Sequence, residues 1–340
     1  MQKHHFHPRN LVRWLRKRRR RAQIRAEVRR FRSLTRKLKK RADLIVDDSI
    51  PDTLVVTPQS ILLHRGSTKR IALTFLAIVH GDEIGGAAVL NRLLAEMAGA
   101  ARSPEIPLAF ILGNPAAALK HARYLERDLN RSFGLTKGNL LEERRARVLG
   151  DLLKETDFLV DFHQTTEETD RPFFIFPFER RSYDFARAIS PRRTIVTHWD
   201  EPAAGEHFPS DGFVQRCGGT AVTIELGKKG MASAQIEDGV ESGLAAYRAV
   251  KEGFGPGKET GPVYTWSDCL PWPTGGFVDT VRGLRNFLPV KEGAKLAEVD
   301  GRAVRAPRDG LVLFPRYLVR RHQATHRPPD LCRILKPIHV

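Results

Sequence analysis

Apolar runs of strand length alternate, after residue 45, with longer stretches in which Leu and Ala recur among charged residues. Short apolar runs that end at Gly, Asn or Pro are typical of buried strands, and the longer stretches have helical composition. The predicted strands are Ile71–Val79, Leu108–Leu112, Phe158–Phe162 and Ala221–Glu225, and the predicted helices are Ala87–Met97 and Glu142–Glu155. This alternation predicts an α/β fold with helices packed on a sheet.

The pattern changes near Gly261, where short apolar pieces are separated by turn residues. Asp300-Gly301 and Asp309-Gly310 are hairpin-type dipeptides, which indicate antiparallel strands. We therefore expect a main α/β domain at residues 45–255 and a smaller β-rich domain at 261–340. The Gly-rich segment 251–262 is the candidate linker between them.

The first 44 residues form a third region with a different pattern. Apolar residues recur there at steps of three and four, and Arg occupies the other faces, which predicts a basic amphipathic helix. These apolar positions are Ile24, Val28, Phe31, Leu34 and Leu38. The helix could lie on anionic lipid or nucleic acid, it could be a solvated and poorly ordered extension, or it could belong to a transit peptide.

Charge separates this region from the rest of the protein. The chain of 340 residues has a net charge of +18. Residues 1–41 contain 18 Lys and Arg and a single acid, Glu27, whereas the other 299 residues contain 39 basic and 38 acidic side chains. The basic balance is therefore a property of the N-terminal extension, and it suggests that residues 1–41 contact an anionic surface such as nucleic acid or a membrane.

Composition excludes several classes of protein. The chain is 41% apolar, which suffices for a sizeable core, but no apolar run approaches the roughly 18 residues of a membrane-spanning helix. The three cysteines show no paired spacing, which excludes a disulfide framework and a thiolate zinc finger. The N-terminal region also lacks the apolar segment of a secretory signal, so we expect a cytoplasmic protein.

Candidate chemistry lies where the predicted strands end. His80 and Glu83 follow the first strand, and His163 follows the strand 158–162. In open α/β sheets ligands bind beyond the carboxyl ends of the strands, so these side chains can converge. Two imidazoles and a carboxylate are a typical ligand set for a catalytic zinc ion. The alternative is that they are polar strand ends satisfied by neighbouring groups.

Glu225 closes another apolar strand and would be partly desolvated there. Such a carboxylate could accept a proton from water and pass it to a departing nitrogen. Alternatively, it could cap a turn or pair with Lys228 or Lys229.

A cluster of cationic side chains lies between residues 114 and 133. It contains the cations Arg123, Arg127 and Arg131, together with the neutral amide Asn130. Arginine binds carboxylates through two parallel hydrogen bonds, so the cluster favours an anionic substrate. One of these arginines could instead stabilise a tetrahedral oxyanion.

Together these residues resemble a known family. The matching motifs are His80-Gly81-Asp82-Glu83, Asn114-Pro115, Arg123-Tyr124, Asp128-Leu129-Asn130-Arg131, Asp161-Phe162-His163 and Ile224-Glu225-Leu226-Gly227. Their order and approximate spacing resemble the succinylglutamate desuccinylase and aspartoacylase family, a relative of zinc carboxypeptidase A. The resemblance covers residues 70–230, and residues 306–315 look like the C-terminal domain of that family.

The resemblance implies a three-layer α/β/α zinc carboxypeptidase-like domain with a mixed sheet and an appended β-rich domain. It implies a zinc-dependent hydrolase, of the deacylase type, that cleaves the linear amide bond of a small anionic N-acyl amino acid. Carried over onto this chain, His80, Glu83 and His163 would hold one Zn²⁺ ion per chain.

The same resemblance implies roles for further residues. Glu225 would be the general base and acid, and Arg123 the oxyanion donor. Asn130 and Arg131 would hold a substrate carboxylate, and Asp161 would either support His163 or be structural.

The chain departs from the family pattern in two places. Arg216 lies near the position of a second substrate-binding arginine, but residues 205–220 contain no Tyr, so selectivity for an acyl-aspartate is not implied. Neither Tyr264 nor Tyr317 aligns with the Tyr that the family's C-terminal domain adds to the active site. Two other functions stay open. One is a metallocarboxypeptidase acting on small peptides, and the other is an inactive hydrolase-like protein tethered by its basic extension.

Overall fold

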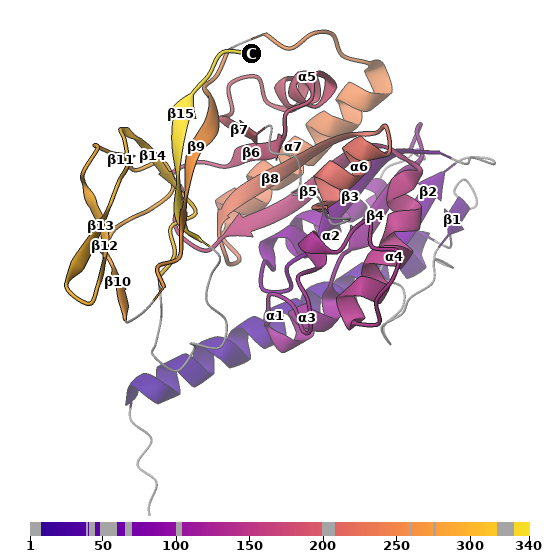
Figure 1. Cartoon of the computed structure of the whole chain (residues 1–340). Helices are drawn as coiled ribbons and strands as arrows, with labels where there is room; N and C mark the ends of the chain where they lie inside the picture. The colour runs from indigo at the N-terminus through magenta and orange to yellow at the C-terminus, as the bar shows by residue number, and fades with distance from the viewer. Residues whose placement is uncertain are drawn as a thin grey trace, which may run out of the picture.

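A mixed sheet of twelve strands forms the centre of the protein in a computed structural model (Figure 1). The structure describes residues 8–38, 40, 45–47, 60–64, 70–99, 104–198, 208–258, 260–274, 277–317 and 330–340. The strand order is β1-β2-β4-β3-β5-β8-β6-β7-β9-β15-β14-β11. In chain order these strands are β1 (Ile45–Asp47), β2 (Ser60–His64), β3 (Ile71–Ala77), β4 (Leu108–Leu112), β5 (Thr156–Thr165), β6 (Phe173–Pro177), β7 (Ile195–His198), β8 (Thr220–Lys228), β9 (Val263–Pro271), β11 (Pro289–Val290), β14 (Gly310–Leu313) and β15 (Asp330–Pro337).

Helices cover both faces of this sheet. They are α1 (Pro8–Leu38), α2 (Gly85–Gly99), α3 (Pro115–Lys120), α4 (Leu141–Lys154), α5 (Arg180–Ile189), α6 (Ser210–Arg216) and α7 (Ser233–Glu252), with a 3₁₀ turn, η1 (Leu129–Arg131). Successive side chains of β3 enter different cores because strand side chains alternate in direction. Phe75 and Ala77 belong to the core shared with α1, α2, α5 and α7, whereas Leu76 packs with Leu149 of α4 and Phe213 of α6. The predicted three-layer α/β/α fold is confirmed.

The centre of the sheet is parallel, and this brings the predicted strand ends together. β4, β3, β5 and β8 pair in parallel, so their carboxyl ends lie at one edge. β6 pairs with β8 antiparallel and makes the sheet mixed. β4 spans the predicted residues, whereas β3 ends at Ala77 because Ile78 adopts a φ of 52° and turns the chain.

The C-terminal β-rich region continues the main sheet. β9 pairs with β7, and β15, β14 and β11 follow outward. A second sheet of three strands is formed by β10 (Val278–Thr280), β12 (Lys295–Val299) and β13 (Arg302–Arg305). Residues 278–313 thus have the predicted β character, but hydrogen bonds of the large sheet join this region directly to the α/β region.

The N-terminal helix is packed against the body of the protein. All five apolar residues of the predicted amphipathic pattern, residues 24, 28, 31, 34 and 38, are buried in the core shared with α2. α1 contacts α2 and α3, and its N-terminal turns reach past them in Figure 1. The alternative of a solvated and poorly ordered extension is therefore wrong for residues 24–38, because burial of the apolar side fixes this part of the helix. Residues 1–7, 39 and 41–44 of the predicted extension lie outside the described residues.

None of the described helices combines the length and the apolar character needed to cross a membrane.

Candidate active site

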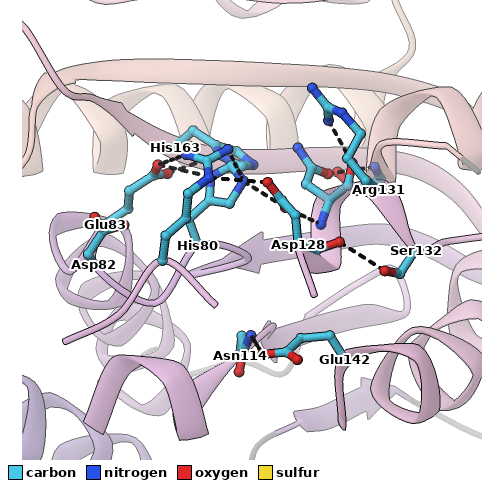
Figure 2. Close-up of polar contacts among 12 residues, drawn as sticks. His80, Asp82, Glu83, Asn114, Asp128, Arg131, Ser132, Glu142 and His163 are labelled. Atoms are coloured by element: carbon cyan, nitrogen blue, oxygen red, sulfur yellow. Dashed lines mark hydrogen bonds and ion pairs between the residues drawn. The ribbon is translucent and has the colours of Figure 1, made fainter. Parts of the chain in front are cut away.

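His80, Glu83 and His163 lie together in the structure, although 80 residues separate the last two. Their potential ligand atoms all fall within 4.8 Å of one another, and all three residues are buried. Nδ1 of His80 lies 2.9 Å from Oε1 of Glu83, and Nδ1 of His163 lies 2.9 Å from Oε2 (Figure 2). The two imidazole nitrogens thus face one carboxylate.

The turn after β3 places His80 and Glu83 at this point. Its shape depends on Gly81, because a Cβ atom there would lie 2.3 Å from the backbone nitrogen of Ala118 in α3. Residue 81 can therefore approach α3 closely only as glycine. The backbone N–H of Gly81 also donates to the carbonyl of Arg123, which ties the turn to the arginine loop.

Each histidine contacts a second carboxylate through its other ring nitrogen. Nε2 of His80 lies 3.2 Å from Oδ1 of Asp128, and Nε2 of His163 lies 3.0 Å from Oδ2 of Asp161. Carboxylates in this position orient metal-bound histidines and fix the tautomer in which the opposite nitrogen is free to coordinate. Asp161 is therefore placed to orient His163. This is one of the two roles, support of His163 or a structural role, that the sequence left open.

This donor set fits a zinc ion. Two imidazole nitrogens and one carboxylate converge from two adjacent strand ends, and the pocket borders them on the remaining side. Three protein ligands with one open position are typical of catalytic zinc sites. Burial alone would raise the pKa of Glu83. The two imidazoles together have the larger effect and hold this pKa well below its ordinary value.

Glu225 lies on β8 opposite His163 on β5, in a different electrostatic setting. It is buried, and its Oε2 makes no hydrogen bond within the described residues. Burial, and then the nearby Glu83 carboxylate, raise the pKa of Glu225 to about 7. The lysines that could have paired with it bind elsewhere, since Lys228 contacts Glu168 and Lys229 contacts Asp82. The structure therefore leaves Glu225 able to exchange a proton near neutral pH.

Arg123 lies next to the two histidines. Its Nε lies 3.1 Å from Oδ2 of Asp128, and its Nη2 lies 2.6 Å from Nε2 of His80. Nη1 lies 3.7 Å from Oε1 of Glu83. This guanidinium is therefore positioned beside the group that would bind a metal.

Asn130 and Arg131 come from the short turn η1 beside Arg123. Asp128 begins this turn by accepting a hydrogen bond from the backbone N–H of Asn130. Oδ1 of Asn130 accepts from the backbone N–H of Ser210, and Nη1 of Arg131 donates to the carbonyl of Asn130. The turn is thus anchored to the start of α6.

One pocket with a volume of about 800 Å³ unites these residues. All eight residues named from the sequence line it: His80, Glu83, Arg123, Asn130, Arg131, His163, Arg216 and Glu225. Arg216 lies with its guanidinium 5.0 Å from the centre of the Phe208 ring. The spatial convergence expected from the strand ends is therefore present.

Sequence reasoning missed the contribution of the C-terminal region to this pocket. Trp266, Arg316 and Arg333 line the pocket, whereas neither Tyr264 nor Tyr317 does. The hydroxyl of Tyr317 instead donates to the carbonyls of Val281 and Leu284. Arg316 follows residues 306–315, the segment that resembles the family, so its position next to that motif was the available signal.

Comparison with protein families identifies a match over residues 68–250, to the succinylglutamate desuccinylase/aspartoacylase catalytic domain. Among curated relatives, succinylglutamate desuccinylase from Serratia proteamaculans is 29% identical over 174 residues, which are 47% of this chain and 52% of the relative. The enzyme of the same name from Yersinia pseudotuberculosis is 26% identical over 181 residues, 48% of this chain and 53% of the relative. The matches thus span about half the length of these relatives.

Solved structures share the fold over more of the chain. Succinylglutamate desuccinylase from Chromobacterium violaceum superposes with a TM-score of 0.65 at 18% identity, covering 90% of this chain and 98% of that one. Murine aminoacylase 3 gives a TM-score of 0.59 at 18% identity and covers 80% and 97% of the two chains. At these identities the likeness concerns the fold.

Proposed function

Because the chain belongs to the succinylglutamate desuccinylase/aspartoacylase family, we propose that it is a zinc-dependent hydrolase that cleaves the amide bond of an N-acyl amino acid. One observation carries this proposal: the convergence of His80, Glu83 and His163 in a pocket that also holds Glu225 and Arg123. Convergence of a metal-type donor set, an unpaired carboxylate and a cation matches what amide hydrolysis requires.

His80, Glu83 and His163 would hold the zinc ion, with Asp128 and Asp161 orienting the two imidazoles. When bound there, zinc would lower the pKa of water and polarise the scissile carbonyl. Glu225 would accept the proton of the attacking water and later donate it to the amine that leaves. Its raised pKa of about 7 suits a group that performs both transfers.

Arg123 would donate a hydrogen bond to the oxyanion that develops when the carbonyl is attacked. Asp128 holds its Nε and so directs the outer nitrogens of the guanidinium toward His80 and Glu83. A fixed donor costs no reorganisation during the reaction, which is why such groups stabilise transition states efficiently.

Asn130 and Arg131 would bind a carboxylate of the substrate, and Arg216 would contribute to the same pocket. A guanidinium and an amide N–H group can both donate to one carboxylate. The expected substrate is therefore a small anionic N-acyl amino acid.

Metal analysis coupled to a substrate screen tests this proposal. Protein purified from zinc-supplemented medium should contain one zinc ion per chain and should hydrolyse at least one of a series of acetyl, succinyl and longer N-acyl amino acids. Hydrolysis of C-terminal residues from short peptides, with no action on the N-acyl amino acids, would support the metallocarboxypeptidase alternative. Absence of zinc and of all turnover would support the inactive hydrolase-like alternative.

We further propose that the exposed side of α1 binds nucleic acid. Its exposed cations are Arg18, Arg19, Arg20, Arg21, Arg25, Arg29, Arg30, Arg36 and Lys37, and the one acid of the helix, Glu27, accepts a hydrogen bond from Asn91 of α2. An amphipathic helix that inserts into a bilayer needs a free apolar side, and between residues 24 and 38 that side of α1 is buried in the core. The cationic side remains available for a phosphate backbone.

A further inference from the structure

The C-terminal β-rich region supplies a second cationic wall to the pocket. Arg316 follows β14, and Arg333 lies on β15, two strands that pair with each other in the main sheet. Both side chains line the pocket that holds His80 and Glu225. The backbone N–H of Arg316 donates to the carbonyl of Leu331, so the segment that carries Arg316 is fixed to the start of β15.

These two guanidinium groups share one carboxylate. Nε of Arg316 lies 3.7 Å from Oδ1 of Asp330, and Nε of Arg333 lies 3.4 Å from Oδ2. Among the described residues, Asp330 is the only acid that forms an ion pair with either arginine. Within the described part of the chain, one positive charge of this wall therefore has no acidic partner.

Trp266 of β9 holds Arg333 in place from the other side. The guanidinium carbon of Arg333 lies 4.2 Å from the centre of the indole ring, which is a cation–π contact. The indole is itself stacked on His198, with 4.3 Å between the ring centres. The arginine is thus preorganised by an ion pair and an aromatic ring, which lowers the entropy lost when it binds a ligand.

The first cationic wall of the pocket is formed by Arg123 and Arg131. It and the second wall repel each other electrostatically. Burial is the largest cause that lowers the pKa of Arg316. Repulsion by arginines 123, 333 and 131 lowers it further. Burial and repulsion by Arg123 and Arg333 likewise lower the pKa of Arg131. Arginines within range of one another in a partly desolvated pocket are destabilising unless an anion lies between them. A single substrate carboxylate at Asn130 and Arg131 would leave the second wall with Asp330 as the only described acid for its two arginines.

We propose that Arg316 and Arg333 bind a second anionic group of the substrate, separate from the carboxylate expected at Asn130 and Arg131. This inference rests on the proposed function, because it assumes that the same pocket binds the N-acyl amino acid. The second anion is a carboxylate either on the acyl group or on the side chain of the amino acid.

Four matched compounds distinguish these two sources. They are N-succinylglutamate, N-succinylglutamine, N-succinamoylglutamate and N-succinamoylglutamine, in which the carboxylate of the acyl group, that of the side chain, or both are exchanged for an amide of nearly equal size and the α-carboxylate is kept. The wild-type protein should show a higher kcat/KM for compounds that carry the recognised second carboxylate than for their amide counterparts. The position at which the preference occurs identifies the source.

Arg316→Gln should reduce that preference by about 10- to 100-fold, the range expected for the loss of a charge-assisted hydrogen bond. Arg316→Lys, which keeps the charge, should retain part of it. Arg308→Gln is the matched control, because Arg308 lies in the same region, pairs with Asp268 and does not line the pocket. An unchanged preference in Arg316→Gln, or the absence of any preference in the wild type, would overturn the proposal.

Equilibrium binding separates this inference from the proposed function. If no compound of the wider N-acyl amino acid series is hydrolysed, the proposed function fails, and these four compounds then serve as stable ligands in calorimetric titrations. Tighter binding of the carboxylate form than of the amide form, lost in Arg316→Gln, would still support the second anion site. Equal binding of all four compounds to both proteins would reject it.

Discussion

Glu83 and Glu225 are two buried carboxylates of one pocket, and their surroundings affect them in opposite directions. Two imidazoles lower the pKa of Glu83 despite its burial, whereas burial and then the charge of Glu83 raise the pKa of Glu225 to about 7. Carboxylates separated in this way can divide the chemistry, one staying ionised to bind a cation and the other exchanging a proton.

Glu225→Gln should lower kcat by about 100- to 10,000-fold, because the amide cannot accept the proton of water. The variant keeps nearly the same volume, and Oε2 of the wild-type residue makes no hydrogen bond within the described part of the chain, so the fold and the zinc content should be retained. Steady-state kinetics together with metal analysis check this. Turnover close to that of the wild type would exclude Glu225 as the general base.

His163→Ala should release zinc, because it removes one of the three converging donors. Metal content per chain after dialysis, measured by emission spectroscopy, is the readout. His121→Asn is a suitable control, since His121 lies outside the pocket and Asn tolerates its φ of 56°. Full metal content in a folded His163→Ala protein would show that His163 is not a ligand.

Single elements hold these residues in place, and the clearest case is the loop before η1. The buried carboxylate of Glu142, at the start of α4, accepts hydrogen bonds from the backbone N–H groups of residues 125, 126 and 127. It also accepts from Nδ2 of Asn114, the residue that caps the N-terminus of α3 (Figure 2). One acidic side chain therefore joins two helix N-termini to the loop that carries Arg123.

Glu142→Gln tests this positioning role. The new amide group would face backbone N–H donors with its own donors, so we expect a loss of about 1–3 kcal/mol in the free energy of unfolding. Arg123 would be held less well, so kcat should fall more than zinc content does. Urea unfolding, kinetics and metal analysis measure the three effects, and Glu105→Gln, at an exposed ion pair with Lys251, is the control. Unchanged kcat would contradict the role.

The helix α1 behaves as part of the core, and this also can be tested. Phe31 is completely buried against the α2 layer, so Phe31→Ala should cost about 3–5 kcal/mol of unfolding free energy. Arg29→Ala, on the exposed side two residues earlier, should change it by less than about 0.5 kcal/mol. Equal stability of the two variants in urea unfolding would show that the helix is not docked in solution.

The whole molecule places its two cationic features on different elements. One is the pocket between the parallel strand ends and the β-rich region, and the other is the exposed side of α1, which packs on α2 and α3. Because the apolar side of α1 is buried, deletion of the helix would expose the core. Substitution of exposed arginines is therefore the sharper test of nucleic-acid binding.

Replacement of Arg19, Arg25, Arg29 and Arg30 by Gln should weaken binding of a labelled 20-base-pair DNA duplex. The slope of log K against log salt should become less steep by about 0.9 for each arginine that contacts a phosphate. Fluorescence anisotropy measures this, with the exposed arginines 282, 302, 305 and 308 of the β-rich region replaced in the control. Binding that is absent from the wild type, equal in both variants, or seen only with anionic vesicles would reject nucleic acid as the partner.

The linear pattern determined the layer architecture, the strand ends and the candidate donors. Short apolar runs marked β3, β4, β5 and β8, because a strand buried on both faces requires a continuous apolar stretch. The polar residues at those ends were therefore visible in the sequence, and parallel pairing implied that they meet.

Tertiary structure alone decided which groups complete the site and where α1 lies. Asp128, Glu142, Arg316 and Arg333 act through contacts with residues far away in the chain, and no local spacing records such contacts. The same applies to α1, since a basic amphipathic pattern fits docking on a core as well as on an anionic surface. Only the burial of its apolar side distinguishes the two, because burial depends on which surface the folded body offers to that helix.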